Sequence, residues 1–104
     1  VEGPKQAMRV YEAGYHQVLA TMGGFGGPQL MFLQLLNCRF FTFFDNDDGG
    51  KKAHETFYRK MLGCNPVTLI DFGDIEKRQP DDLTVDEVQQ LFIRKGVEQW
   101  RDNS

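Results

Sequence analysis

The clearest pattern of hydrophobic and polar positions lies near the start of the chain. Its apolar residues recur at alternating steps of three and four, which places their side chains on one helical face. These residues are Met8, Tyr11, Tyr15, Val18 and Met22. The pattern predicts an amphipathic helix over about residues 5–22, ended by Gly23, because glycine readily adopts the left-handed conformation that follows many helices.

The pattern changes twice between residues 28 and 45. Pro28 suits the first turn of a helix, where its missing N–H would have no partner, so we predict a helix over about residues 28–37. The next run, RFFTFF, clusters aromatic side chains with threonine and predicts a strand over about residues 39–45. The alternative is one continuous helix over residues 28–44, apolar on nearly every side, which would need burial all round or a partner subunit.

A second helix and strand follow in the same order. Ala53, Phe57 and Met61 form an apolar face over about residues 51–62, and the acids before this segment lie near the positive end of the predicted helix dipole. Residues 67–73 are rich in β-branched and aromatic side chains, which predicts a strand. A helix that starts at the preceding Asn-Pro pair is the competing interpretation.

The last predicted helix covers about residues 84–100. It opens with Thr84 and carries Glu87 three residues later, a capping-box pattern in which each side chain accepts the other's backbone N–H. Val85, Val88 and Leu91 begin its apolar face, and Gly96 is expected to weaken or bend it.

Together these elements predict a helix-rich α+β fold. Helices over about residues 5–22, 28–37, 51–62 and 84–100 would pack on a small sheet that contains a βαβ unit, with strands at about 39–45 and 67–73. The alternative is an all-α bundle. Because 104 residues is close to the commonest domain length, we expect residues 1–104 to form a single domain.

Composition and charge exclude several classes of protein. A formal net charge of −3, with basic residues scattered in small groups, argues against nucleic-acid binding. Polar residues interrupt the longest apolar run, so no membrane-spanning helix is expected. Cys38 and Cys64 belong to no CxxC motif or Cys/His cluster, which favours buried free thiols and a cytoplasmic location, with one bridge left open. A first residue Val1 rather than Met is consistent with processing or with a longer parent chain.

Acidic residues gather at the ends of both predicted strands. If the strands are parallel, their carboxyl ends meet at one edge of the sheet, where oxygen ligands could hold Mg²⁺ or Ca²⁺. The candidate ligands are Asp45, Asp47, Asp71 and Asp74. Read as a calcium-binding EF-hand loop, the segment fails at two ligand positions, which hold Gly49 and Thr56. Acids after a strand are also common helix caps and turn formers.

Other chemistry has little support in the sequence. The two histidines, His16 and His54, are expected to be structural, and a Cys64–His54 pair is the nucleophilic alternative. Short strings that resemble motifs of known families each cover less than a third of the chain, so we assign no family.

The aromatic content points to association with another protein. The chain contains nine Phe and four Met, and six of the Phe lie between residues 25 and 44. A two-stranded sheet has few faces on which to bury them, and large exposed apolar patches usually mark an interface. The expected interface residues are Phe25, Met31, Phe32, Phe40 and Phe43. A well-filled monomeric core is the alternative.

We therefore expect a small non-enzymatic interaction or regulatory domain that forms a homodimer or binds another protein, and that needs no cofactor. The alternative is a metal-dependent or small-ligand-binding enzyme that uses the acidic cluster, with a divalent cation as its cofactor.

Overall fold

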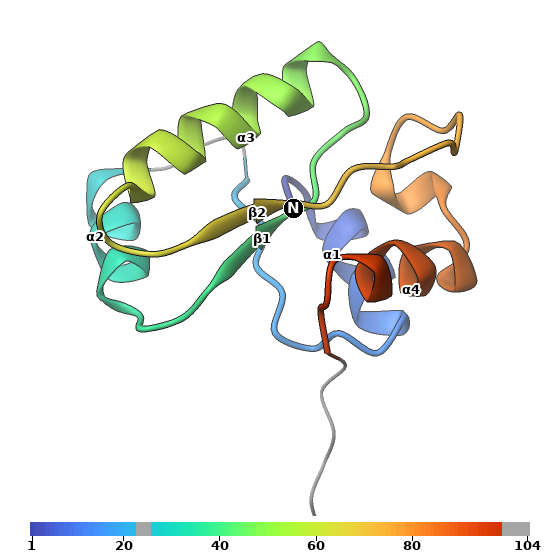
Figure 1. Cartoon of the computed structure of the whole chain (residues 1–104), viewed down its shortest axis with the longest axis horizontal. Coiled ribbons are helices and arrows are strands. Elements are labelled where there is room, and N and C mark those ends of the chain that lie inside the picture. Colours follow the sequence, from blue (N-terminus) through green and yellow to red (C-terminus); the bar gives the residue numbers. More distant parts are fainter. Residues whose placement is uncertain (23–25, 99–104) are drawn as a thin grey trace, which may run out of the picture.

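The computed structural model describes residues 1–22 and 26–98 (Figure 1). Its helices and strands are, in chain order, α1 (Pro4–Glu12), α2 (Gly27–Leu35), β1 (Phe40–Thr42), α3 (Asp48–Met61), β2 (Val67–Leu69), the 3-10 helix η1 (Pro80–Asp82) and α4 (Val85–Arg94). Within the described residues, four α-helices and a two-stranded parallel sheet make the fold mixed α+β and helix-rich, as predicted.

The two strands pair in parallel, with Phe40 opposite Val67 and Thr42 opposite Leu69. Both strands are shorter than the predicted ranges 39–45 and 67–73. The pairing ends after Ile70, whose N–H donates to the carbonyl of Thr42 at 2.8 Å. Beyond it the partners change, since the N–H of Asn46 donates to the carbonyl of residue 78 instead. The aromatic and β-branched residues that predicted longer strands thus continue for a few positions beyond the last residue that has a partner strand.

Two apolar clusters lie on opposite sides of the short sheet. Successive strand residues point to opposite faces, so Phe40 packs with α2 and α3 while Phe41 and Phe43 pack with α1 and α4. Figure 1 shows the same division, with α2 and α3 toward one end of the molecule and α1, η1 and α4 toward the other. The sheet therefore separates the two apolar clusters and the helices that pack on each.

Helix α1 ends well before the predicted residue 22. Gly14 has a positive φ of 101°, and its N–H donates to the carbonyl of Tyr11 at 2.9 Å. The N–H of Tyr15 donates to the carbonyl of Val10 at 3.2 Å. This pair of bonds is a Schellman motif, which ends a helix at a left-handed glycine. Residues 15–22 are therefore not part of a helix, although their apolar residues have helical spacing. The predicted helix end at Gly23 lies outside the described residues.

Helix α4 shows a predicted start and an unpredicted end. The capping box is confirmed, because Thr84 Oγ1 accepts the N–H of Glu87 at 3.1 Å and Glu87 Oε1 accepts the N–H of Thr84 at 2.9 Å. The helix ends at Arg94 rather than near residue 100. Gly96, with φ 79°, forms a second Schellman motif, in which the N–H of Val97 donates to the carbonyl of Phe92 at 3.0 Å. Residues 99 and 100 lie outside the described part.

The other two helices differ from prediction mainly at their boundaries. α2 covers residues 27–35, against a prediction of 28–37. α3 begins at Asp48 rather than at residue 51, because Asp47 Oδ1 accepts the N–H of Gly50 at 2.8 Å and so caps the helix three residues early. Among the described residues, no helix is long and apolar enough to cross a bilayer.

Candidate functional site

Helix α2 has an apolar side that nothing in the described chain covers. Its sequence, GPQLMFLQL, contains no charged residue. Leu33 is buried in the cluster with Phe57 and Met61, which fixes the inner side of the helix. The other side carries Met31, Phe32 and Leu35, which are 64%, 61% and 82% exposed. Residues three and four apart share a helix face, so these three form one surface, called here the α2 face.

Contacts between α2 and the end of α3 hold the α2 face in place. Gln34 Nε2 donates to the carbonyl of Lys60 at 2.9 Å. Asn65 Nδ2 donates to the carbonyls of Leu36 and Cys38, which ties the segment after α2 to the segment after α3. Leu62, just after α3, is 60% exposed and adds apolar surface at this end of the molecule. The face is thus presented by a helix that is anchored at its C-terminal end.

The predicted interface residues differ in how far the structure buries them. Met31 and Phe32 are exposed on α2. Phe40 is half-buried, and its ring meets that of Phe57 edge-on at 5.5 Å. The prediction for Phe43 needs correction, because Phe43 is 2% exposed and belongs to the core. Phe25 lies outside the described residues.

Sequence reasoning missed Leu35, the most exposed residue of the α2 face. A signal was present, since Leu35 stands four residues after Met31 and three after Phe32. On a helix these positions are neighbours. The spacing alone would therefore have added Leu35 to the predicted interface.

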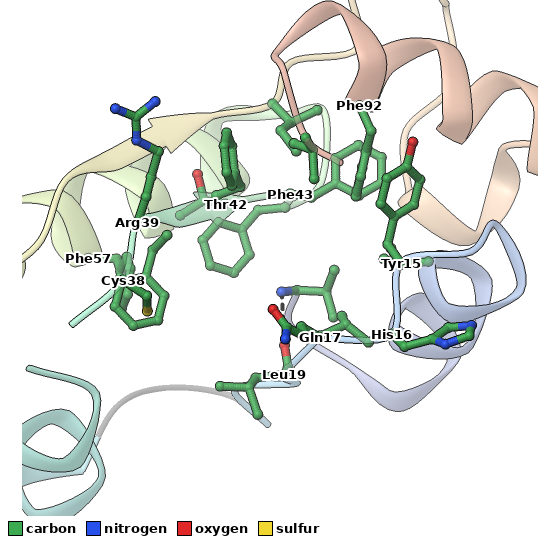
Figure 2. A pocket seen from close by; sticks show the side chains of 18 of the residues that line it. Tyr15, His16, Gln17, Leu19, Cys38, Arg39, Thr42, Phe43, Phe57 and Phe92 are labelled. Atoms are coloured by element: carbon green, nitrogen blue, oxygen red, sulfur yellow. Dashed lines mark hydrogen bonds between the residues drawn. The ribbon is translucent and has the colours of Figure 1, made fainter. Parts of the chain in front are cut away.

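A cleft of about 850 Å³ lies between α2, β1 and the segment after α1 (Figure 2). Leu33 of α2, Phe57 of α3 and Phe43 form part of its wall, and residues 15–19 face them across the opening. The segment after α1 is held by the start of the chain, and Val1 itself lines the cleft. The N–H of Thr21 donates to the carbonyl of Val1 at 2.9 Å, and the N–H of Met22 donates to that of Glu2 at 2.7 Å. These bonds attach this wall of the cleft to the start of the chain.

Asp45 and Asp47, the two candidate ligands that follow β1, each contact other side chains. Asp45 Oδ1 accepts from Gln6 Nε2 at 3.1 Å, and burial raises the pKa of this carboxyl, with the neighbouring Asp47 and Glu2 adding to the shift. Asp47 caps α3 and also pairs with Arg78 at 3.1 Å. The Gly50 N–H and the Arg78 guanidinium lower the pKa of Asp47. Both side chains therefore help to connect α1, α3 and the segment before η1.

The two acids that follow β2 are placed differently. Asp71 lies 4.0 Å from Lys95 Nζ, and Asp74 is exposed. Across residues 1–22 and 26–98, no group of three or more His, Cys, Asp or Glu side chains is arranged to hold a metal ion. The metal hypothesis for Asp45, Asp47, Asp71 and Asp74 thus stays a prediction.

His54 connects α3 to β1 through the hydroxyl of Thr42. Its Nδ1 lies 2.6 Å from Thr42 Oγ1, and burial lowers the pKa of the imidazole, against an opposite effect of Glu55. The neutral ring therefore suits this position.

Acidification is expected to weaken the fold through His54. Because its pKa is below the ordinary value of 6.5 in the folded chain, the unfolded chain takes up the proton first as the pH falls. The free energy of unfolding should decrease as the pH falls from about 6.5 through the folded pKa. Urea unfolding between pH 8 and pH 5 would measure this. The His54→Gln variant should lose this component, so its stability difference from the parent should shrink with falling pH, and a constant difference would contradict the assignment.

The cysteines are free, as expected, but not buried. Cys38 and Cys64 are both exposed and form no disulfide. Burial of these thiols was expected from the usual environment of unpaired cysteine. Both cysteines instead lie in the turns that lead into the two strands, outside either apolar cluster.

Both thiols are therefore expected to react in the folded protein. Titration with an aromatic disulfide reagent, without denaturant, should release two equivalents of thiolate per chain. The Cys38→Ser and Cys64→Ser variants should each release one. If either thiol reacts only after denaturant is added, its exposed position would be wrong.

The described chain is thus a small mixed α+β protein with an uncharged, exposed helix face and an apolar cleft beside it. Comparisons with protein-family models, with curated proteins and with solved structures find no match to this chain.

Proposed function

We propose that this chain is a small non-enzymatic interaction domain that binds a second copy of itself through the α2 face. The observation that carries the proposal is the exposure of Met31, Phe32 and Leu35 on a helix without charged residues. Most surface helices turn a polar side to water, and apolar helices are normally covered. Covering these side chains would remove apolar surface from water, the main driving force of protein association.

A second copy suits this surface better than an unrelated partner does. In a two-fold dimer the same surface faces itself, so any charged group near the axis would meet its own like charge. The α2 face carries none. Two α2 helices could therefore pack against each other without burying an unpaired charge. If the pure chain stays monomeric, a different protein is the alternative partner for this face.

The test is the molar mass in solution as a function of protein concentration. Light scattering coupled to gel filtration should show a mass that rises from 12.0 kDa toward twice that value. The Leu35→Lys variant should dissociate, with its dimer weakened at least roughly tenfold, because it places like charges opposite each other. Since Leu35 is 82% exposed, the fold itself should be unaffected.

Ile93→Lys is the matched control. Ile93 is also an exposed apolar residue, at 66%, but lies on α4 at the other end of the molecule. This variant should dimerise like the parent chain. A constant mass of 12.0 kDa at every concentration would refute self-association. Equal effects of the two substitutions would place the interface elsewhere.

We also propose a reducing, cytoplasmic location. Two exposed cysteines without a disulfide support it, because exposed thiols seldom stay reduced in oxidising compartments.

A further inference from the structure

The cleft between α2, β1 and the segment after α1 is apolar over most of its wall. Buried side chains from four parts of the chain contribute to it: Leu33, Phe43, Phe57 and Phe92. Its volume, about 850 Å³, falls within the roughly 300–1,000 Å³ typical of small-molecule sites. An apolar wall around such a volume favours an apolar guest over water.

The shape of the cleft favours a long ligand. Leu33 and Phe57 belong to the apolar cluster on the α3 side, whereas Phe43 and Phe92 belong to the cluster on the α4 side. One opening therefore runs alongside the sheet from one cluster to the other (Figure 2). A flexible, extended molecule could contact both ends, which a compact one could not do.

Two charged side chains line the cleft at its rim, and the amino group of Val1, which donates to the carbonyl of Leu19 at 3.1 Å, lies within the wall. Arg39 and Glu98 both line the cleft and are both exposed. Figure 2 shows the Arg39 side chain directed out of the cleft, with its guanidinium on the side away from Phe43 and Leu19. Arg39 takes part in none of the four ion pairs between described residues. Because this side chain is long and exposed, a change of rotamer could bring its guanidinium to an anion at the mouth, while Glu98 would repel an anion from its own end.

We propose that the cleft binds a long-chain fatty acid, with the acyl chain along the aromatic wall and the carboxylate on Arg39. A guanidinium can donate two parallel hydrogen bonds to a carboxylate. The aromatic part of the wall would receive the methylene chain, whose transfer from water is favourable. This site is separate from the α2 face, whose residues Met31, Phe32 and Leu35 are not among the lining residues.

The test uses a fluorescent polyene fatty acid as the probe and palmitate as its competitor. The probe should show a saturable rise in fluorescence at one molecule per chain, below its micelle concentration, and palmitate should displace it. Arg39→Gln should weaken palmitate binding by about tenfold, the size expected for one charged contact at an exposed rim. It should leave competition by hexadecanol unchanged, because the alcohol has no carboxylate.

Two more variants distinguish binding in the cleft from nonspecific binding of the probe to apolar surface. Arg59→Gln removes another exposed arginine, on α3, that is not among the lining residues, and should change nothing. Leu19→Glu places a charge on an exposed lining residue and should weaken both the acid and the alcohol. Far-UV circular dichroism would verify that each variant is folded.

Several results would overturn the proposal. These are the absence of saturable binding, equal losses in Arg39→Gln and Arg59→Gln, or unchanged binding in Leu19→Glu. Sedimentation of the protein with phosphatidylcholine–phosphatidylserine vesicles would instead indicate a membrane surface as the source of the acyl chain, which the proposal excludes. The Leu35→Lys variant should still bind palmitate, so failure of the dimer and failure of the cleft would be distinguishable.

Discussion

Replacement of Gly50 by alanine is expected to destabilise the fold by about 3 kcal/mol or more, because the new methyl group has no space. A Cβ at this position would lie 1.8 Å from the carbonyl oxygen of Asp45 and 2.7 Å from its carbonyl carbon. Both atoms belong to the backbone, so no side chain can move aside. The start of α3 would have to shift away from the end of β1, which would also disturb the cap formed by Asp47.

The neighbouring glycine supplies the matched control. A Cβ at Gly49 would lie 3.3 Å from Asp47 Oδ1 and would meet nothing else nearby. Alanine is preferred to glycine in a helix by about 1 kcal/mol, so Gly49→Ala should stay within about 1 kcal/mol of the parent. Urea unfolding of the two variants measures the difference. Similar stabilities for Gly49→Ala and Gly50→Ala would mean that α3 does not approach Asp45 as described.

Phe43→Ala is expected to cost about 3–5 kcal/mol of folding free energy, the usual range for removal of a buried aromatic ring. Phe43 is 2% exposed, and its ring lies 5.4 Å from that of Phe72 and 5.1 Å from that of Phe92. Domains of this size are stable by only about 5–15 kcal/mol. The variant should therefore be partly or wholly unfolded near body temperature, as thermal unfolding would show.

Phe32→Ala is the control for this prediction, because it makes the same chemical change at a residue that is 61% exposed. Its unfolding free energy should change by no more than about 0.5 kcal/mol, while self-association through the α2 face should weaken. The reverse outcome, a stable Phe43→Ala monomer and a destabilised Phe32→Ala, would exchange the two roles and reinstate Phe43 as an interface residue.

Local signals account for most of what could be predicted about the fold. Pro28 at the start of α2 and the Thr84–Glu87 capping box at the start of α4 act within one turn of helix. The end of α1 was also a local signal, since Gly14 adopts a positive φ there, but the spacing of later apolar residues obscured it. Periodicity over residues 15–22 reflected a segment that packs against the core without being helical.

The candidate site was less predictable, because exposure depends on distant parts of the chain. Phe40, Phe41 and Phe43 lie within four consecutive residues and are chemically identical, yet the first packs toward α3 and the other two toward α4. Nothing within the run RFFTFF indicates which helix will cover which face. Likewise, the sequence did not indicate that Gln6 and Arg78, 39 and 31 residues away, would contact Asp45 and Asp47.

The sequence by itself determined the helix-rich α+β class, the order of the elements and the starts of α2 and α4, because caps and side-chain periodicity depend on residues a few positions apart. Only the tertiary structure decided that Phe43 is core while Met31, Phe32 and Leu35 are surface. It also decided that Gly50 must lack a side chain and that a cleft remains between α2 and β1. These features depend on which distant segments approach each other, and that is set by the packing of the whole chain.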